Sequence, residues 1–109
     1  MDTTQALTDE LVKELDSDFF NIFTESIRNE ILRFLLINGE CDVGKIAQAF
    51  SQDRSVISRH LQMMFKANVL NQKRQGRFVF YTINGGAIIT KLDRITNKIK
   101  ECIAICCPV

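Results

Sequence analysis

The feature of this sequence that most limits its fold is a pair of helix-forming segments joined by a very short turn. Asp42 can cap a short helix, because its carboxylate accepts hydrogen bonds from the free N–H groups of the first turn. The turn Ser51-Gln52-Asp53 follows, and its last residue can cap a second helix from Arg54 to about Ala67. Two helices joined in this way are typical of a helix-turn-helix, here spanning residues 42–67.

The segment after this pair predicts a β-hairpin. Residues 69–83 contain two stretches with β-branched and aromatic side chains on either side of a turn at Gln75-Gly76. Three basic residues lie near that turn: Lys73, Arg74 and Arg77. A hairpin in this place is the wing of a winged helix-turn-helix. The sequence therefore predicts a mainly α fold with a small β-hairpin, in a single domain over residues 1–109.

The second helix of the pair is expected to have one buried and one polar face. Apolar residues at helical spacing predict the buried face, which consists of Val56, Ile57, Leu61, Met64 and Phe65. The polar side chains left on or near the outer side are Arg54, Ser55, Ser58, Arg59 and Gln62. Such side chains hydrogen-bond to base edges and phosphates, so together with the three basic hairpin residues they are the predicted DNA-binding residues. The alternative is a solvated amphipathic helix beside a basic hairpin.

The charge of the chain is polarised, although its net value is only +1. Residues 1–53 hold eleven acidic and four basic residues, whereas residues 54–109 hold two acidic and ten basic residues. A basic half favours a local anionic partner, most simply double-stranded DNA.

An enzyme is not predicted from this sequence. It has no nucleophile with a general base at a spacing typical of a catalytic pair, no phosphate-binding glycine loop and no catalytic carboxylate pair.

Both ends of the chain predict helices that form a dimer. Residues 1–23 include an apolar stripe at helical spacing from Leu7 onward, with a break expected around residues 16–18. A last helix is predicted over residues 87–107, and its apolar residues alternate steps of four and three: Ile88, Leu92, Ile95, Ile99, Cys102 and Cys106. We call this row of six residues the seam; an apolar row of this kind requires a second helix packed against it. We expect the first and last helices to form a two-fold homodimer that matches two operator half-sites.

The sequence also predicts a cytoplasmic protein without a membrane partner. The N-terminal residues include Asp2, Asp9 and Glu10 and lack an apolar run, and no later stretch reaches membrane-spanning length. Cytoplasmic cysteines are normally reduced, so the four cysteines are expected to be thiols, ligands or redox sensors. The only histidine, His60, is expected to be a partly buried and hydrogen-bonded residue of its helix.

Three motifs resemble those of the ArsR/SmtB family of metalloregulatory repressors. They are residues 39–47, residues 56–61, and Gly76-Arg77 followed by Phe80-Tyr81. The resemblance covers roughly residues 19–107. It implies a homodimer that binds an operator, represses a resistance or efflux operon, and leaves the DNA when an inducer binds.

The C-terminal cysteines are the predicted inducer site. Cys102 and Cys106 share a helix face, and Cys107 follows where Pro108 discourages helical geometry. Three thiolates suit a soft ion, and three-coordination by sulfur favours As(III) or Sb(III) as inducer, without an organic cofactor. Alternatively, Cys102 and Cys106 simply complete the apolar seam.

The chain departs from the family at two other inducer sites. Zinc-sensing members have Asp and His ligands on the last helix, but residues 87–109 contain no His and only two acids, so a zinc site is not expected. The Cys-Val-Cys arsenic motif is also absent, since Asp42, Val43 and Gly44 occupy its place. Cys41 resembles the first thiol of members that sense persulfide or oxidants, so a redox switch between Cys41 and a C-terminal cysteine is the alternative function. Cys41 could equally be a small buried residue before a helix cap.

Overall fold

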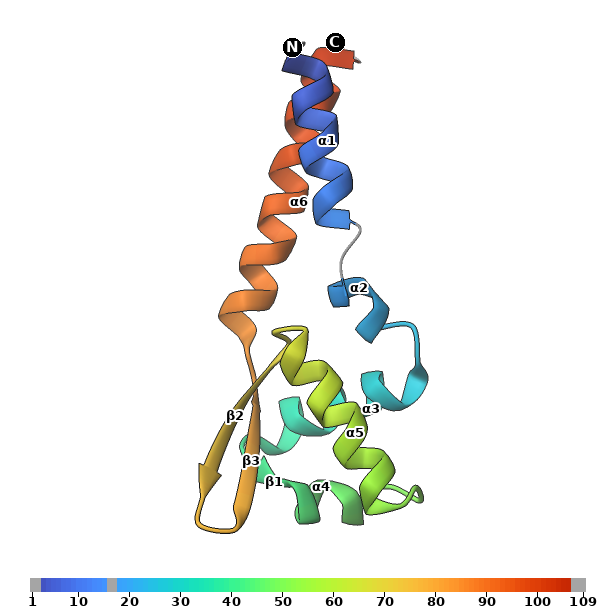
Figure 1. Ribbon diagram of the computed structural model, residues 1–109, viewed down its shortest axis with the longest axis vertical. Helices are drawn as coiled ribbons and strands as arrows, with labels where there is room; N and C mark the ends of the chain where they lie inside the picture. The colour runs from blue at the N-terminus through green and yellow to red at the C-terminus, as the bar shows by residue number, and fades with distance from the viewer. Residues whose placement is uncertain (1–2, 16–17, 107–109) are drawn as a thin grey trace.

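The computed structural model describes residues 3–15 and 18–106. In chain order the elements are α1 (Thr3–Leu15), α2 (Asp18–Ile22), α3 (Ser26–Asn38), β1 (Cys41–Asp42), α4 (Val43–Gln48), α5 (Arg54–Lys66), β2 (Leu70–Gln75), β3 (Phe78–Ile83) and α6 (Gly85–Cys106). The molecule is elongated, with extents of 53 × 25 × 24 Å. Figure 1 shows two parts: a winged-helix unit formed by α2 to β3, and an arm formed by α1 and α6 side by side.

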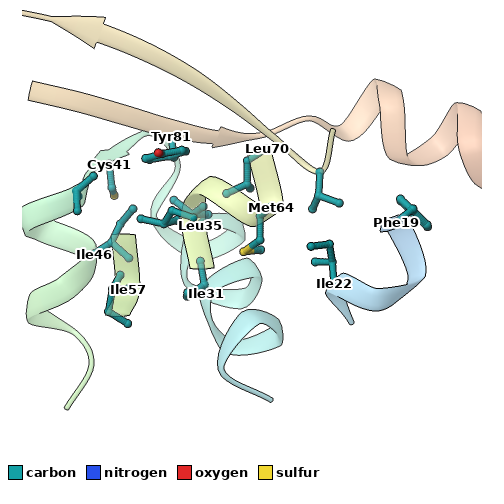
Figure 2. Close-up of a cluster of buried hydrophobic side chains, with 13 residues drawn as sticks. Phe19, Ile22, Ile31, Leu35, Cys41, Ile46, Ile57, Met64, Leu70 and Tyr81 are labelled. Carbon is teal, nitrogen blue, oxygen red and sulfur yellow. The ribbon is translucent and has the colours of Figure 1, made fainter. Parts of the chain in front are cut away.

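The winged-helix unit is organised around one apolar core. Figure 2 shows side chains from α2, α3, α4, α5 and the sheet meeting in this core. Its fully buried members include Ile31, Ile46, Ile57, Leu61, Met64 and Tyr81. Because each helix contributes one apolar face to the same cluster, their relative orientation is fixed by packing. The core therefore holds α4 and α5 in a defined arrangement.

The predicted helix-turn-helix is confirmed as α4, a short turn and α5. Asp42 is the N-cap of α4, and its side chain accepts a hydrogen bond from the Lys45 N–H at 3.4 Å. Asp53 is the N-cap residue of α5, but its side chain makes no capping hydrogen bond; its backbone carbonyl accepts the N–H groups of Val56 and Ile57 instead. Asn68, with a φ of 68°, ends the segment in the left-handed region, which asparagine tolerates better than most residues.

The wing belongs to a three-stranded antiparallel sheet of order β1-β3-β2, rather than to a hairpin alone. The strand β1 was not predicted; its two residues, Cys41 and Asp42, pair with Tyr81 and Phe80 of β3. The wing also begins at Leu70 and not at residue 69, because the Val69 N–H donates to the Met64 carbonyl at the end of α5. The turn between β2 and β3 contains Gly76 with a φ of 60°, a conformation that glycine adopts without strain.

The last helix of the arm begins earlier than predicted. The last helix starts at Gly85, two residues before the expected start, because the Asn84 side chain accepts a hydrogen bond from the Ala87 N–H at 3.3 Å and caps it. The first helix starts at Thr3 and ends at Leu15, and α2 starts at Asp18; the intervening part of the expected break lies outside the described residues. Among residues 3–15 and 18–106, no helix combines the length and apolarity needed to cross a membrane.

Ion pairs join α1 to α6 within the arm. The Lys91 Nζ lies 2.5 Å from the Glu14 Oε2, and Lys98, two helical turns further along α6, pairs with Glu10. Little apolar surface is buried here, since no residue of α1 and only Ile95 of α6 is buried. Large apolar side chains along the arm are exposed by 38–61%: Val12, Leu15, Ile89, Leu92, Ile99 and Ile103.

Candidate nucleic-acid interface

The helix α5 has the polar outer face that its sequence predicts. Ile57, Leu61 and Met64 are buried on one side of it. On the other side Arg54, Ser55, Arg59 and Gln62 are exposed and Ser58 is half-buried. The spacing of these five residues puts them on a continuous surface two turns long. Five hydrogen-bonding side chains on one helix face can contact both base edges and phosphates.

Two residues assigned to the buried face of α5 are less buried than predicted. Phe65 is 38% exposed, because it follows Ser58 by seven residues and therefore lies on the same, outer side of the helix. Val56 is only half-buried. The buried face is thus narrower than the apolar pattern suggests, and an aromatic ring borders the polar surface.

The sequence did not single out Gly44, although it shapes the start of this surface. A Cβ at Gly44 would lie 3.3 Å from the Asp42 Oδ2 and 3.4 Å from an Arg54 Nη atom. The end of the Arg54 side chain therefore lies close to Gly44, and a Cβ at this position would contact it.

The three basic residues of the wing do not form one patch. Neighbouring residues on a strand point to opposite faces, so Lys73 and Arg74 lie on opposite sides of the sheet. The Lys73 Nζ is 3.5 Å from the Glu40 Oε2, an exposed contact that partly neutralises it. The Arg77 guanidinium lies 5.3 Å from the centre of the Phe78 ring, within cation–π range. The wing thus presents positive charge on both faces and at its tip.

His60 is the half-buried, hydrogen-bonded residue that was expected. Its Nδ1 lies 3.3 Å from Nη1 of Arg28, a buried arginine on α3 that no sequence pattern singled out. Burial, and then the positive charge of Arg28, lowers the pKa of His60 below its ordinary value. The imidazole is therefore neutral at neutral pH.

The cysteines lie at two ends of the molecule. Cys102 is half-buried and Cys106 exposed, one turn apart on α6, whereas Cys107 lies outside the described residues. Cys41 is 1% exposed in β1, at the end of the molecule opposite the C-terminal end of α6 (Figure 1). This placement keeps Cys41 away from Cys102 and Cys106 within one chain. Among the described residues, no three His, Cys, Asp or Glu side chains lie close enough to hold a metal ion.

The arrangement of α4, α5 and the three-stranded sheet defines the class of the protein as a winged helix-turn-helix DNA-binding regulator. Comparison with known proteins agrees with this class. The family model described as bacterial regulatory protein, arsR family, matches residues 25–72. The chain belongs to the ArsR family, whose members are transcriptional regulators and not enzymes.

Two curated relatives cover most of this fold. The transcriptional repressor SdpR of Bacillus subtilis is 28% identical over 85 residues, which are 78% of this chain and 93% of that protein. An uncharacterised HTH-type transcriptional regulator of Methanocaldococcus jannaschii is 31% identical over 70 residues, 64% of this chain and 79% of that protein.

Two solved structures have the same fold. A possible transcriptional regulator for arsenical resistance has a TM-score of 0.64 and 26% identity, over 75% of this chain and 83% of that one. The homodimeric winged helix-turn-helix domain of a possible ArsR-family regulator from Mycobacterium bovis has a TM-score of 0.61 and 25% identity, over 93% of this chain and 88% of that one.

Proposed function

We propose that this protein is a homodimeric transcriptional repressor that binds operator DNA and releases it when As(III) or Sb(III) binds its C-terminal cysteines. The observation that carries DNA binding is the polar outer face of α5, which includes the exposed Arg59 and Gln62. In a winged helix-turn-helix this helix enters the major groove, and the wing contacts the adjacent backbone. The DNA-binding residues of the proposal are Arg54, Ser55, Ser58, Arg59, Gln62, Lys73, Arg74 and Arg77.

The exposed apolar residues of the arm support a homodimer. Leu92 and Ile99 of the predicted seam are 45% and 38% exposed, and Val12 of α1 is 61% exposed. A second copy of the arm covers such a surface by two-fold symmetry, because the same patch then meets itself. The solved Mycobacterium bovis relative is described as homodimeric. Two copies would place two α5 helices on neighbouring half-sites of one operator.

The thiols of α6 support a soft-ion inducer. Cys102 and Cys106 share one face of the helix and neither is buried, so both can reach a ligand. The third donor of the proposal, Cys107, is the next residue along the chain. When bound, a trivalent metalloid supplies bonds to three sulfur atoms and so fixes the relative positions of its cysteines. The similarity to a possible regulator for arsenical resistance supports this class of inducer.

The junction of the arm with the winged-helix unit leaves room for a shift. A cleft of about 470 Å³ separates α2, the end of α5 and the start of α6; Phe19, Lys66, Gly86 and Arg94 are among its lining residues. Since α6 continues directly from β3, a change in the position of α6 moves the wing and α5 relative to the partner subunit. Coupling free energies between two sites are typically about 1–3 kcal/mol, enough to lower operator affinity ~5- to 150-fold.

The test measures operator release by candidate inducers. An operator is enriched from a random pool of DNA duplexes with the parent protein, and its affinity is then followed by fluorescence anisotropy with As(III), Sb(III), Zn(II) or a persulfide donor. We expect release by As(III) or Sb(III), which Cys102→Ser and Cys107→Ser abolish. The matched control, Cys41→Ser, changes the buried thiol at the far end and keeps the metalloid response.

Two results would contradict the inducer assignment. One is metalloid release that persists in both C-terminal variants. The other is release by the persulfide donor alone that disappears in Cys41→Ser, which supports the redox switch instead.

A further inference from the structure

Arg28 is the buried charged residue among those that the structure describes. It lies on α3 and is 2% exposed. Its Nε donates to the Ile22 carbonyl and its Nη2 to the Asn21 carbonyl, each at 2.9 Å. Both carbonyls belong to the C-terminal end of α2, where backbone oxygens lack partners within the helix. A cation in this place satisfies them and interacts favourably with the helix dipole.

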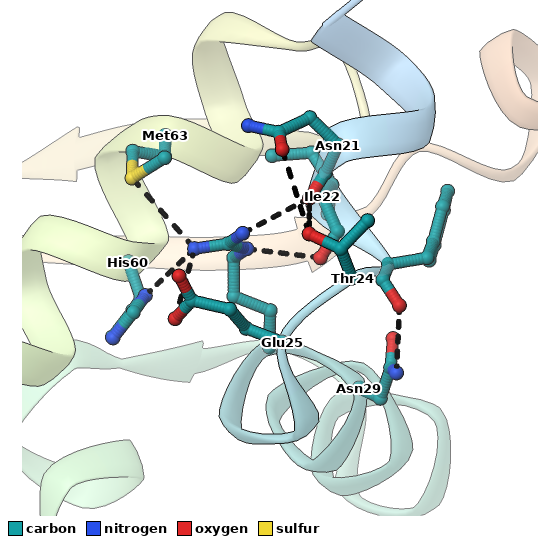
Figure 3. Close-up of polar contacts among 9 residues, drawn as sticks. Asn21, Ile22, Thr24, Glu25, Asn29, His60 and Met63 are labelled. Atoms are coloured by element: carbon teal, nitrogen blue, oxygen red, sulfur yellow. Dashed lines mark hydrogen bonds and ion pairs between the residues drawn. The ribbon is translucent and has the colours of Figure 1, made fainter.

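The third nitrogen of the same guanidinium reaches α5. Its Nη1 lies 3.3 Å from the His60 Nδ1, 3.9 Å from the Met63 Sδ and 3.5 Å from the Glu25 Oε2 (Figure 3). Arginine has donors and no acceptor, so the His60 Nδ1 must accept and the imidazole proton is on Nε2. One planar group thus contacts α2 and α5 at once, from a position on α3.

These contacts adjoin the candidate DNA-binding face. His60 directly follows Arg59, and Met63 directly follows Gln62. The two residues of α5 that Arg28 contacts are therefore next in the chain to two residues of that face. On its other side Arg28 holds the end of α2, the element next to the arm in the chain. An apolar side chain of similar volume could fill the same space, but it would remove the donor to the Ile22 carbonyl and to the His60 Nδ1. The Asn21 carbonyl would keep the Thr24 hydroxyl, which donates to it at 2.7 Å.

We infer that Arg28, acting through His60, is a positioning residue that fixes the orientation of α5 relative to α2 and thereby sets operator affinity. This role rests on the proposed DNA-binding function. The guanidinium is rigid and planar, and its five N–H donors hold fixed directions, so it sets angles between its partners as well as distances. Lysine, with one flexible ammonium group, cannot bond α2 and α5 with the same geometry.

The experiment compares specific and non-specific DNA binding by the full-length protein. The variants are Arg28→Lys, Arg28→Met, His60→Leu and His60→Gln, and the probes are the enriched operator and a duplex of unrelated sequence. Arg33→Met on the exposed side of α3 is the matched control, since its side chain is 72% exposed. Urea unfolding identifies conditions in which each variant is folded, and affinities are compared only there.

We expect Arg28→Lys, Arg28→Met and His60→Leu to lose about tenfold or more in operator affinity while folded. Affinity for the unrelated duplex stays within about twofold, because it depends on phosphate contacts that these variants keep. His60→Gln retains an acceptor for Arg28, so we expect it to bind the operator more tightly than His60→Leu. The double variant Arg28→Met/His60→Leu is expected to lose no more than Arg28→Met alone, as for two residues that act as one unit.

The inference is overturned if folded His60→Leu and Arg28→Lys bind the operator as the parent does, even if Arg28→Met fails to fold. It is also overturned if all variants lose specific and non-specific binding equally, since that reports general destabilisation. A parent protein that enriches no operator at all contradicts the proposed function itself, which is a separate outcome.

Discussion

The winged-helix unit and the arm bury apolar surface to very different extents. In the unit, α2 to β3 contribute a continuous buried cluster that includes Ile31, Leu61 and Tyr81, each at most 1% exposed. In the arm, α1 has no buried residue and α6 has only Ile95, while several large aliphatic side chains are exposed by more than a third. The comparison indicates that the unit carries its own core, whereas the arm needs a partner to complete one.

The largest expected difference between the two parts concerns folding. Leu61→Ala removes a fully buried side chain from the unit and is expected to cost about 2–5 kcal/mol of unfolding free energy, because it leaves a cavity. Ile89→Ala on the arm removes a side chain that is 61% exposed, and we expect a cost below about 1 kcal/mol. Urea unfolding of both variants measures the difference. Equal losses would mean that the arm belongs to the same core.

The second prediction concerns the surface that the arm leaves exposed. Leu92→Glu places a charge in the predicted seam, so we expect a monomer and an operator affinity at least ~100-fold lower, because one half-site is then bound without its neighbour. Analytical ultracentrifugation and anisotropy measure the two effects. Lys100→Glu, at an exposed position of the same helix, is the control and should leave the dimer intact. A Leu92→Glu dimer would exclude this seam as the interface.

The third prediction separates DNA binding from stability within the unit. Arg59→Ala removes an exposed side chain of α5, so we expect a loss of about 1–3 kcal/mol in operator affinity and no change in unfolding free energy. Arg33→Ala on α3 removes the same charge away from the predicted interface and should change neither. If the two variants lose equal operator affinity, the loss is due to the change in net charge and not to the outer face of α5.

The fourth prediction concerns the wing. Lys73→Ala is expected to lower the slope of log affinity against log salt concentration by about 1, as for the loss of one phosphate contact. Glu40→Gln should raise operator affinity slightly, because it removes the carboxylate that lies 3.5 Å from the Lys73 ammonium. A salt titration of both variants tests this. An unchanged slope for Lys73→Ala would place this side of the wing away from DNA.

The smallest expected effect is the pH response of the arm. The hydrogen bond from Lys91 holds the pKa of the Glu14 carboxyl below its ordinary value. A lowered carboxyl pKa stabilises the folded state above the ordinary pKa, and this contribution disappears as the pH falls through the lowered value. Because the pair is partly exposed, we expect at most about 0.5 kcal/mol. Urea unfolding at pH 7 and pH 3 should show a smaller pH response for Glu14→Gln than for the parent.

Local signals accounted for most of the winged-helix unit. Asp42 and Gly76 occupy the predicted cap and turn, because a carboxylate can accept the first N–H groups of a helix and glycine adopts a positive φ without strain. The polar face of α5 also followed from helical spacing alone. The strand β1 could not be predicted in this way, because two residues carry no periodic pattern and pair only with a strand forty residues away.

The candidate site was predictable where it depends on one helix and unpredictable where it depends on several. Arg28 looks like any surface arginine in the sequence, because its partners are the ends of α2 and one side of α5, which meet only after folding. Gly44 gave no signal for the same reason, since the Arg54 guanidinium approaches it from the next helix.

The sequence by itself determined the helix-turn-helix, the wing and the polar residues of α5, because caps, turns and apolar spacing act between near neighbours in the chain. The tertiary structure decided which side chains are buried, which basic residues share a face, and that Cys41 lies far from Cys102. These properties depend on contacts between segments that are distant in the chain. Such contacts stabilise the protein only once the core and the arm have assembled.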